Sequence, residues 1–202
     1  MDAYSPPLNN RTLGRDTSGA TIVEFAVVAP IFIGIIMFIF DLGFMAYARS
    51  ILSGEINAVG RASALETATD QRRADMDARV AEKVRLIVPD GTVTFDRESF
   101  NTYGRAQTRV EPFVDGNDND TCDAGQSYLD LNGNSRFDLN GARAGGGGAR
   151  DVVIYTATLR YTRFFPLAAL FGMDNDVELQ ARTILKNQPF DQQSQPTSGV
   201  CA

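Results

Sequence analysis

The chain has 202 residues, 44% of them hydrophobic, and a formal net charge of −6 at pH 7. This length accommodates one membrane helix and one modest globular domain. The acidic balance, without a basic stripe interleaved with aromatic residues, excludes a typical nucleic-acid-binding protein. Histidine is absent, which excludes Ser-His-Asp and Cys-His catalytic arrangements and histidine-ligated zinc.

The first segment, residues 1–19, is polar, contains Pro and Asn pairs and has no apolar periodicity. We predict a disordered leader. Its Arg11 and Arg15 favour a cytoplasmic position, because positive charges flanking a membrane segment tend to stay inside.

One long helix is predicted over residues 20–66. No charged residue occurs between Glu24 and Asp41. At a rise of about 1.5 Å per residue, the apolar part is long enough to cross a hydrocarbon core of about 30 Å. We expect the membrane part at about residues 22–47, in a single pass with membrane lipid around it and the rest of the chain outside the cytoplasm. Pro30 is expected to bend the helix without ending it.

Glu24 is unusual, because a carboxylate inside an apolar helix is costly and normally marks a charge that meets a partner. An amine is the simplest partner. A cut between Gly19 and Ala20 would leave a positive α-amino group on Ala20 and would make Glu24 the fifth residue of the mature chain. The alternative is an uncleaved signal anchor in which Glu24 reaches the membrane interface.

The arrangement of Gly19, Ala20 and Glu24 resembles the processing site of type IV pilins and pseudopilins. In that family a prepilin peptidase cuts after Gly, and the fifth-residue Glu pairs with the free N-terminus of a neighbouring subunit. The wider run, with Val23-Glu24-Phe25-Ala26, Pro30 and Gly43, is most similar to the TadE family of minor pilins of the tight-adherence (Tad) pilus.

This resemblance implies a non-enzymatic minor pilin or pseudopilin that takes part in Tad pilus assembly. It implies a pilin-like α+β fold, in which a long N-terminal helix precedes a small domain with an antiparallel sheet. The implied partners are a prepilin peptidase, other pilins and Tad assembly proteins. The implied location is the bacterial inner membrane, with the C-terminal domain periplasmic and later in an extracellular pilus.

Two alternatives from other classes stay open. The first is an uncleaved, membrane-anchored periplasmic scaffold that binds calcium. The second is an anchored hydrolase that uses a pair of carboxylates, although no Asp or Glu is flanked by a recognisable nucleophile or base pattern.

Beyond Asp41 the helix carries two patterns. Small residues recur at every fourth position, which allows another helix to approach closely: Ala46, Ser50, Gly54, Ala58 and Ala62. Leu52, Ile56 and Val59 form an apolar stripe at helical spacing. Packing among helices in a filament and packing on the domain's own sheet are both compatible with these patterns.

The remaining segment, residues 67–190, is predicted to be an α+β domain. Apolar residues spaced by three and four indicate a helix over about 70–88, ended by Pro89-Asp90-Gly91. Short strands are expected at 92–96 and 108–114. Alternating apolar residues predict longer strands at 153–162 and 177–186. The tail, residues 191–202, is expected to be flexible.

An Asp- and Asn-rich insertion covers residues 115–141. Oxygen-bearing side chains recur at positions one, three, five and nine of two EF-hand-like loops: Asp115, Asn117, Asn119 and Asp123 in the first, and Asp130, Asn132, Asn134 and Asp138 in the second. Ca²⁺ takes six to eight oxygen ligands, which alternate side chains on a tight turn can supply.

The match to an EF-hand is incomplete. Gln126 and Gly141 occupy the twelfth positions, where a bidentate Glu is expected, and Asp120 and Ser135 occupy the sixth, where Gly is expected. The sequence therefore predicts weak calcium binding. A surface insertion rich in Asx turns and without an ion is the alternative.

The chain has two cysteines, Cys122 and Cys201. In an oxidising compartment they can form a disulfide that tethers the tail, and two free thiols are the alternative. No CxxC spacing is present, so a redox or metal pair is not indicated.

Overall fold

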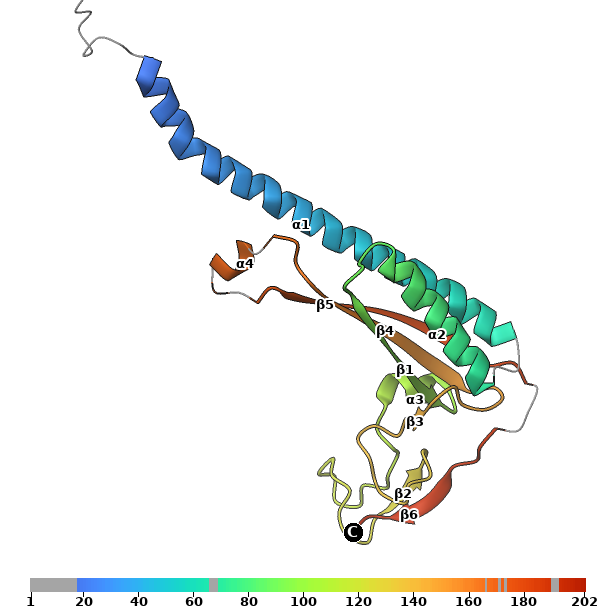
Figure 1. The fold of residues 1–202 in the computed structure, drawn as a ribbon. Coiled ribbons are helices and arrows are strands. Elements are labelled where there is room, and N and C mark those ends of the chain that lie inside the picture. Colours follow the sequence, from blue (N-terminus) through green and yellow to red (C-terminus); the bar gives the residue numbers. More distant parts are fainter. Residues whose placement is uncertain (1–17, 66–68, 166, 171, 173, 190–192) are drawn as a thin grey trace, which may run out of the picture.

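The computed structural model describes residues 18–65, 69–165, 167–170, 172, 174–189 and 193–202 (Figure 1). Most of the predicted leader, residues 1–17, lies outside the described residues. The described chain forms one long helix, a domain built on an antiparallel sheet, and a smaller loop-rich part that contains the C-terminus (Figure 1). The predicted α+β class is confirmed.

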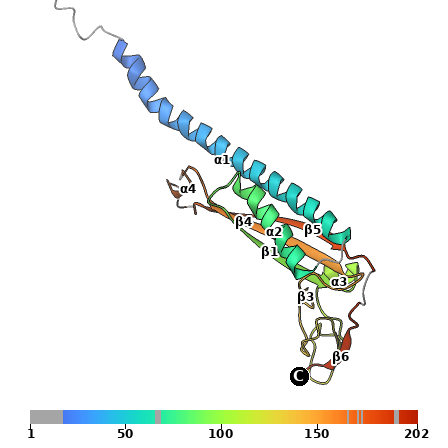
Figure 2. The same ribbon diagram turned by 45° about the vertical axis from the view of Figure 1, so that its right-hand side comes forward.

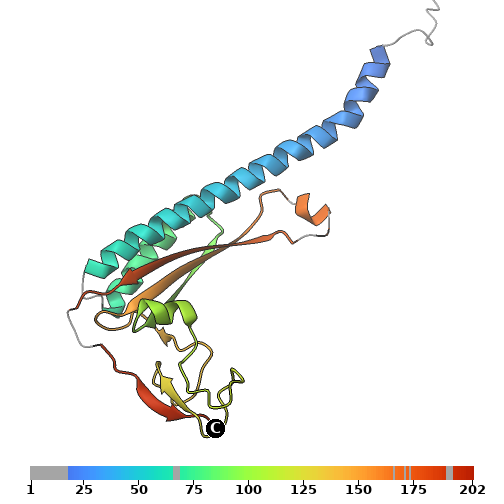
Figure 3. The same cartoon turned by 180° about the vertical axis from the view of Figure 1, so that it is seen from behind.

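The long helix α1 covers Ser18–Leu65 and continues through Pro30. Its N-terminal half projects beyond the domain and curves away from it (Figures 1 and 3). The large side chains of this half are exposed, including Ile22, Phe25, Ile31, Phe32 and Phe40. In the described chain α1 is the one helix long and apolar enough to cross a membrane.

The main sheet has four antiparallel strands in the order β3-β1-β4-β5. Its strands are β1 (Thr92–Phe100), β3 (Arg143–Ala144), β4 (Val152–Thr162) and β5 (Asp176–Lys186). The two strands predicted from alternation are thus β4 and β5, which form a hairpin. A second sheet pairs β2 (Ser127–Asp130) with β6 (Thr197–Val200).

The C-terminal half of α1 and the helix α2 (Asp70–Arg85) lie on the same side of the main sheet (Figures 1 and 2). Thr69 caps α2, because its hydroxyl accepts a hydrogen bond from the backbone N–H of Arg72. The core between the helices and the sheet consists of buried apolar residues: Ala48, Leu52, Ile56, Val80, Val84, Val88, Tyr155, Ala157, Leu159, Tyr161, Val177, Leu179 and Ala181.

A charged cluster also ties α2 to the sheet. Arg97 of β1 donates from both terminal nitrogens to the carboxylate of Asp77, at 2.6 and 2.8 Å, and the Tyr155 hydroxyl donates to the same carboxylate. Burial raises the pKa of Tyr155, and Asp77 raises it further. Burial alone would lower the pKa of Arg97, but the hydrogen bonds and charge of Asp77 outweigh it and the pKa is raised.

Two expectations about local structure are wrong. The segment 108–114 is not a strand: the helix α3 (Tyr103–Thr108) ends there, Arg109 has a positive φ of 62°, and Phe113 makes an isolated bridge to Tyr128. The tail is not loose throughout, because Thr197–Val200 form β6 against β2. The remaining short helix is α4 (Leu167–Leu170), in the connection between β4 and β5.

Candidate functional site

The residues expected at the processing site lie at the N-terminal end of α1. Gly19 and Ala20 are in its first turn and are exposed, and Glu24 follows with an exposed side chain. Residues four apart lie on the same helix face, so Glu24 is on the face of Ala20. Within the described part of the chain, no hydrogen bond or ion pair involves Glu24.

The two patterns on the C-terminal half of α1 point to opposite sides. Leu52 and Ile56 are fully buried against the sheet and α2, and Val59 packs beside them. The small residues that recur every fourth position are all exposed, and we call them the small-residue face: Ala46, Ser50, Gly54, Ala58 and Ala62. A Cβ added at Gly54 or Gly43 would meet no atom within 4 Å. The domain's own packing therefore uses the apolar stripe and leaves the small-residue face open.

The first Asx loop, residues 115–126, brings its four predicted ligands together. The amide groups of Asn117 and Asn119 both donate to one oxygen of Asp123 at 2.9 Å. Asp115 accepts a backbone hydrogen bond from Asp120 at 2.8 Å. This bond is the main reason that the pKa of Asp115 lies below its ordinary value of 3.8.

The second Asx loop, residues 130–141, repeats the pattern position by position. Asn132 and Asn134 donate to one oxygen of Asp138, at 2.9 and 2.6 Å. Asp130 accepts the backbone N–H of Ser135 at 2.8 Å, as Asp115 does from the sixth residue of its own loop. Two segments with the same residue types at the same spacing thus fold in the same way.

A residue outside both loops, Glu111, belongs to this site. Its side chain is fully buried, and its two carboxylate oxygens accept the backbone N–H groups of Leu131 and Asp138, at 2.8 and 3.0 Å. Two charge-assisted bonds to backbone donors hold the carboxylate in one place. The loop spacing gives no signal for Glu111, because it precedes both loops in the chain.

Glu111 takes the role that the twelfth residue has in the first loop. There, the side-chain oxygen of Gln126 accepts the N–H of Asp123, the ninth residue, at 3.0 Å. In the second loop Glu111 accepts the N–H of Asp138, also the ninth residue, while the twelfth residue is Gly141. The absence of a side chain at Gly141, the twelfth position of the second loop, was the one signal in the sequence that a residue from outside the loop accepts this hydrogen bond.

These loops present carboxylate and amide groups that a hard cation can use. The Asn side chains of each loop turn their NH₂ groups to a carboxylate, while their oxygens accept hydrogen bonds from other groups of the same loop. Among the residues that the structure describes, no group of three or more Asp, Glu, His or Cys side chains is placed to hold a metal ion. A cation here would therefore depend on amide and backbone oxygens in addition to carboxylates.

Cys122 and Cys201 form a disulfide, with their Cα atoms 5.9 Å apart. The backbone of Cys201 also exchanges hydrogen bonds with the first loop, donating to Gln126 at 2.9 Å and accepting from Gly125 at 3.0 Å. The bridge therefore attaches the end of the chain to the first Asx loop.

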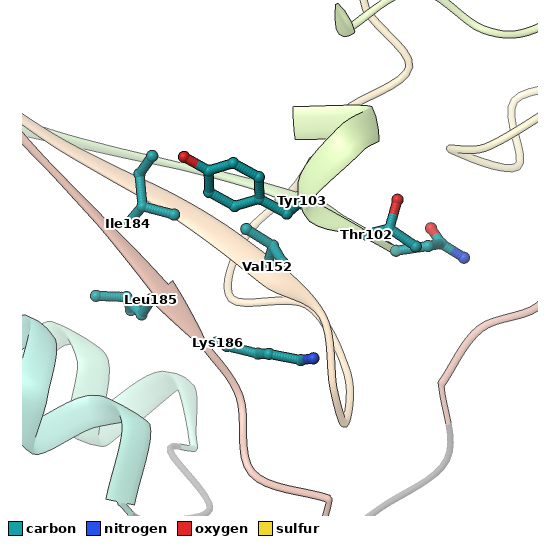
Figure 4. Close-up of a pocket in the computed structure, with 7 residues that line it drawn as sticks. Thr102, Tyr103, Val152, Ile184, Leu185 and Lys186 are labelled. Carbon is teal, nitrogen blue, oxygen red and sulfur yellow. The ribbon is translucent and has the colours of Figure 1, made fainter. Parts of the chain in front are cut away.

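An open groove lies near α3 and the C-terminal end of β5. Tyr103 extends from α3 towards Ile184 across β4, where Val152 lies (Figure 4). The groove is also lined by Asn101, Thr102, Leu185 and Lys186. Lys186 and Tyr103 are the titratable groups of this lining, and no carboxylate or thiol accompanies them. This combination of residues gives no arrangement for acid-base or nucleophilic catalysis.

Comparison with known proteins gives one match. A family model described as TadE-like protein matches residues 19–54, which include the proposed processing site, the apolar half of α1 and part of the small-residue face. No curated protein and no solved structure matches the chain. The resemblance stated from the sequence is thus confirmed for this segment, and the match does not extend to the sheet or the Asx loops.

Proposed function

We propose that this chain serves in the Tad pilus system as a non-enzymatic minor pilin or pseudopilin. The TadE-like segment at residues 19–54 supports its association with that system. Its partners in this proposal are a prepilin peptidase, other pilins and Tad assembly proteins. The helix α1 holds the protein in the inner membrane, with the domain on the periplasmic side, until assembly.

The single observation that carries this proposal is the division of α1 into a buried and an open side. Exposed apolar side chains cover its N-terminal half, and the small-residue face continues the exposed surface along the half that packs on the domain. Small residues let helix backbones approach closely, which favours helix-to-helix packing. A surface helix that packs only on its own domain typically carries charged and polar residues on its open side, and not a row of small ones.

Glu24 has a specific role in this proposal. Prepilin peptidase cuts after Gly19, and the new α-amino group of Ala20 in one subunit pairs with Glu24 of another. Pairing the two charges removes the cost of leaving either one alone in an apolar environment. The exposed position of Glu24 on the face of Ala20 supports this arrangement.

The first residue of the mature protein tests the proposal. The full chain is produced with a prepilin peptidase, purified from membranes and measured by intact mass and N-terminal sequencing. We expect a chain that begins at Ala20 and that remains uncut in the Gly19→Lys variant, whereas the control Gly14→Lys is processed normally. A wild-type chain that still begins at Met1 would contradict the pilin proposal and favour the uncleaved anchor.

A second candidate function is calcium binding by the Asx loops. Glu111 favours it, because this buried carboxylate supplies the second loop with the residue type that its twelfth position lacks. In this proposal Ca²⁺ replaces the amide donors on Asp123 and Asp138. A scaffold that binds calcium is compatible with either a cleaved or an uncleaved helix.

Calcium titration of the full chain in detergent decides this second candidate. Heat of binding and a rise in Tm at millimolar calcium are expected, and both should fall in Asp138→Asn, which removes a charge from the second loop. Glu178→Gln, which removes an exposed charge from β5, is the control. No heat and no rise in Tm would leave the loops as hydrogen-bonded turns.

A further inference from the structure

The turn between β4 and β5 is unusually apolar for a hairpin connection. Residues 164–173 read Phe-Phe-Pro-Leu-Ala-Ala-Leu-Phe-Gly-Met and contain no charge, although Arg163 and Asp174 flank them directly. We use the name hairpin tip for the residues of this connection that the structure describes, which are Phe164, Phe165, α4 and Gly172. Within the hairpin tip, Phe164 is 59% exposed, and Ala169 and Gly172 are also exposed. Exposed connections are normally polar, so this composition requires an explanation.

The hairpin tip lies beside the middle of α1, close to the end of its apolar half. In Figures 1 and 3, α4 is farther towards the N-terminal end of α1 than α2 or the rest of the sheet. The ring of Phe164 packs edge-on against Phe44 of α1, with ring centroids 4.7 Å apart, and Tyr161 contacts the same ring at 5.7 Å. The β4–β5 hairpin therefore follows α1 in the direction of the proposed membrane.

An ion pair sets the level of the hairpin along α1. Asp41 is the first charged residue after Glu24, so it marks the end of the charge-free run of α1. Its side chain is 7% exposed and pairs with Arg163, whose side chain is 22% exposed. Through this pair, Arg163 lies beside the end of the charge-free run of α1. The hairpin tip extends from Arg163 towards the N-terminal end of α1, so it lies beside the charge-free run itself.

We propose that the hairpin tip is a membrane-contacting element that inserts into the interface of the leaflet where α1 leaves the bilayer. The proposal rests on α1 being membrane-embedded, as in the proposed function. Lipid is the occupant that the structure favours, because the tip is uncharged and continuous with the exposed apolar side chains of α1. Amphipathic and aromatic segments of this kind bind at the boundary of headgroups and acyl chains.

This contact would give the domain a fixed orientation on the membrane. With α1 as the only contact, the domain could rotate about the point where α1 leaves the bilayer. A second membrane contact at the hairpin tip would restrict this rotation. The neutral Asp41–Arg163 pair is suited to the interface, since paired charges cost less in a medium of low polarity than single ones.

Tryptophan fluorescence tests the proposal, because the chain contains no Trp. Three single-Trp variants of the full chain are placed in nanodiscs that hold one copy and contain phosphatidylethanolamine and phosphatidylglycerol, with or without brominated acyl chains. Ala169→Trp reports on the hairpin tip, Phe38→Trp on the membrane helix and Tyr103→Trp on the distal domain. Brominated lipid should quench the first two and leave the third unchanged.

The outcomes separate this inference from its premise. If Phe38→Trp is quenched and Ala169→Trp is as unquenched as Tyr103→Trp, the hairpin tip does not contact lipid and the inference is wrong, although the membrane helix stands. Blue-shifted but unquenched emission from Ala169→Trp would place it against protein and would also overturn the inference. If Phe38→Trp itself is unquenched, the membrane anchor fails and the inference fails with it.

Discussion

The side chain of Glu111 occupies the space beside Gly141 where a side chain at that position would lie. A Cβ added to Gly141 would come within 2.6 Å of Cγ and 3.2 Å of Oε1 of Glu111. Gly141 is the twelfth residue of the second Asx loop, so the missing side chain of this position and the presence of Glu111 are two parts of one packing arrangement.

Gly141→Ala is expected to destabilise the protein by about 1–3 kcal/mol, the usual cost of forcing extra atoms into a packed site. The new Cβ would displace a carboxylate that is fixed by two backbone hydrogen bonds. Thermal unfolding of the full chain in detergent measures the change. Gly104→Ala in α3, where a Cβ meets nothing within 4 Å, is the control and should not lower Tm. Equal Tm values for both variants would contradict this account of Glu111.

The small-residue face should matter for assembly and not for folding. Ala58→Leu adds a large side chain to an exposed position of α1, so we expect the free energy of unfolding to change by less than about 0.5 kcal/mol. Pilus formation, measured by electron microscopy in a strain that depends on this chain, should be lost. Ala78→Leu makes the same change at an exposed position of α2 and should leave piliation intact. Normal piliation in Ala58→Leu would argue against helix packing through this face.

The ion pair between Arg97 and Asp77 should contribute strongly to stability. Both side chains are mostly buried, at 14% and 20% exposure. Asp77→Asn leaves a charged Arg97 without its counterion and weakens the contact to Tyr155, so a loss of about 3 kcal/mol is expected. Glu178→Gln breaks the exposed pair with Arg160 and should cost much less, because solvent screens exposed charges. Chemical denaturation measures both, and similar losses would contradict the difference in burial.

Acid should weaken the connection between β1 and the end of α3. Burial alone would raise the pKa of Glu98, but hydrogen bonds from Asn140 and Arg109 outweigh it and keep the pKa below its ordinary value of 4.5. Because the folded pKa is lowered, this stabilisation is fully present above about pH 4.5 and is lost as the pH falls through the folded pKa.

Tm measured over this acid range should therefore decline less steeply in Glu98→Gln than in the wild type. The variant starts from a lower Tm at neutral pH, because it lacks the charge that faces Arg109. Parallel Tm curves for the two proteins would show that Glu98 does not contribute to the acid response.

The sequence predicted the parts of this fold that have a regular pattern. The uncharged run of α1 and the alternation in β4 and β5 depend on local periodicity, and the structure confirms these elements. Periodicity also predicted α2, whose buried residues Val80 and Val84 are one helical turn apart.

The segments that were missed depend on contacts between distant residues. Thr197–Val200 has no apolar alternation, and it becomes a strand because β2 and the disulfide at Cys201 hold it. The segment 108–114 was predicted to be a strand. Instead, the side chain of Glu111 points towards the second Asx loop and accepts a hydrogen bond from Leu131, and Arg109 has a positive φ. Glu111 itself could not be found, because its partners come later in the chain and its spacing to them matches no motif.

The bridge between Cys122 and Cys201 also decides where the chain can be labelled. Because Cys201 is covalently attached to the first Asx loop, the C-terminal residue Ala202 stays at the end of the molecule opposite the start of α1 (Figure 1). An epitope or fluorophore fused after Ala202 would report on the part of the domain farthest from the start of α1, without disturbing the packing of α1. Reduction before labelling would release that restraint, so such reporters belong on the oxidised protein.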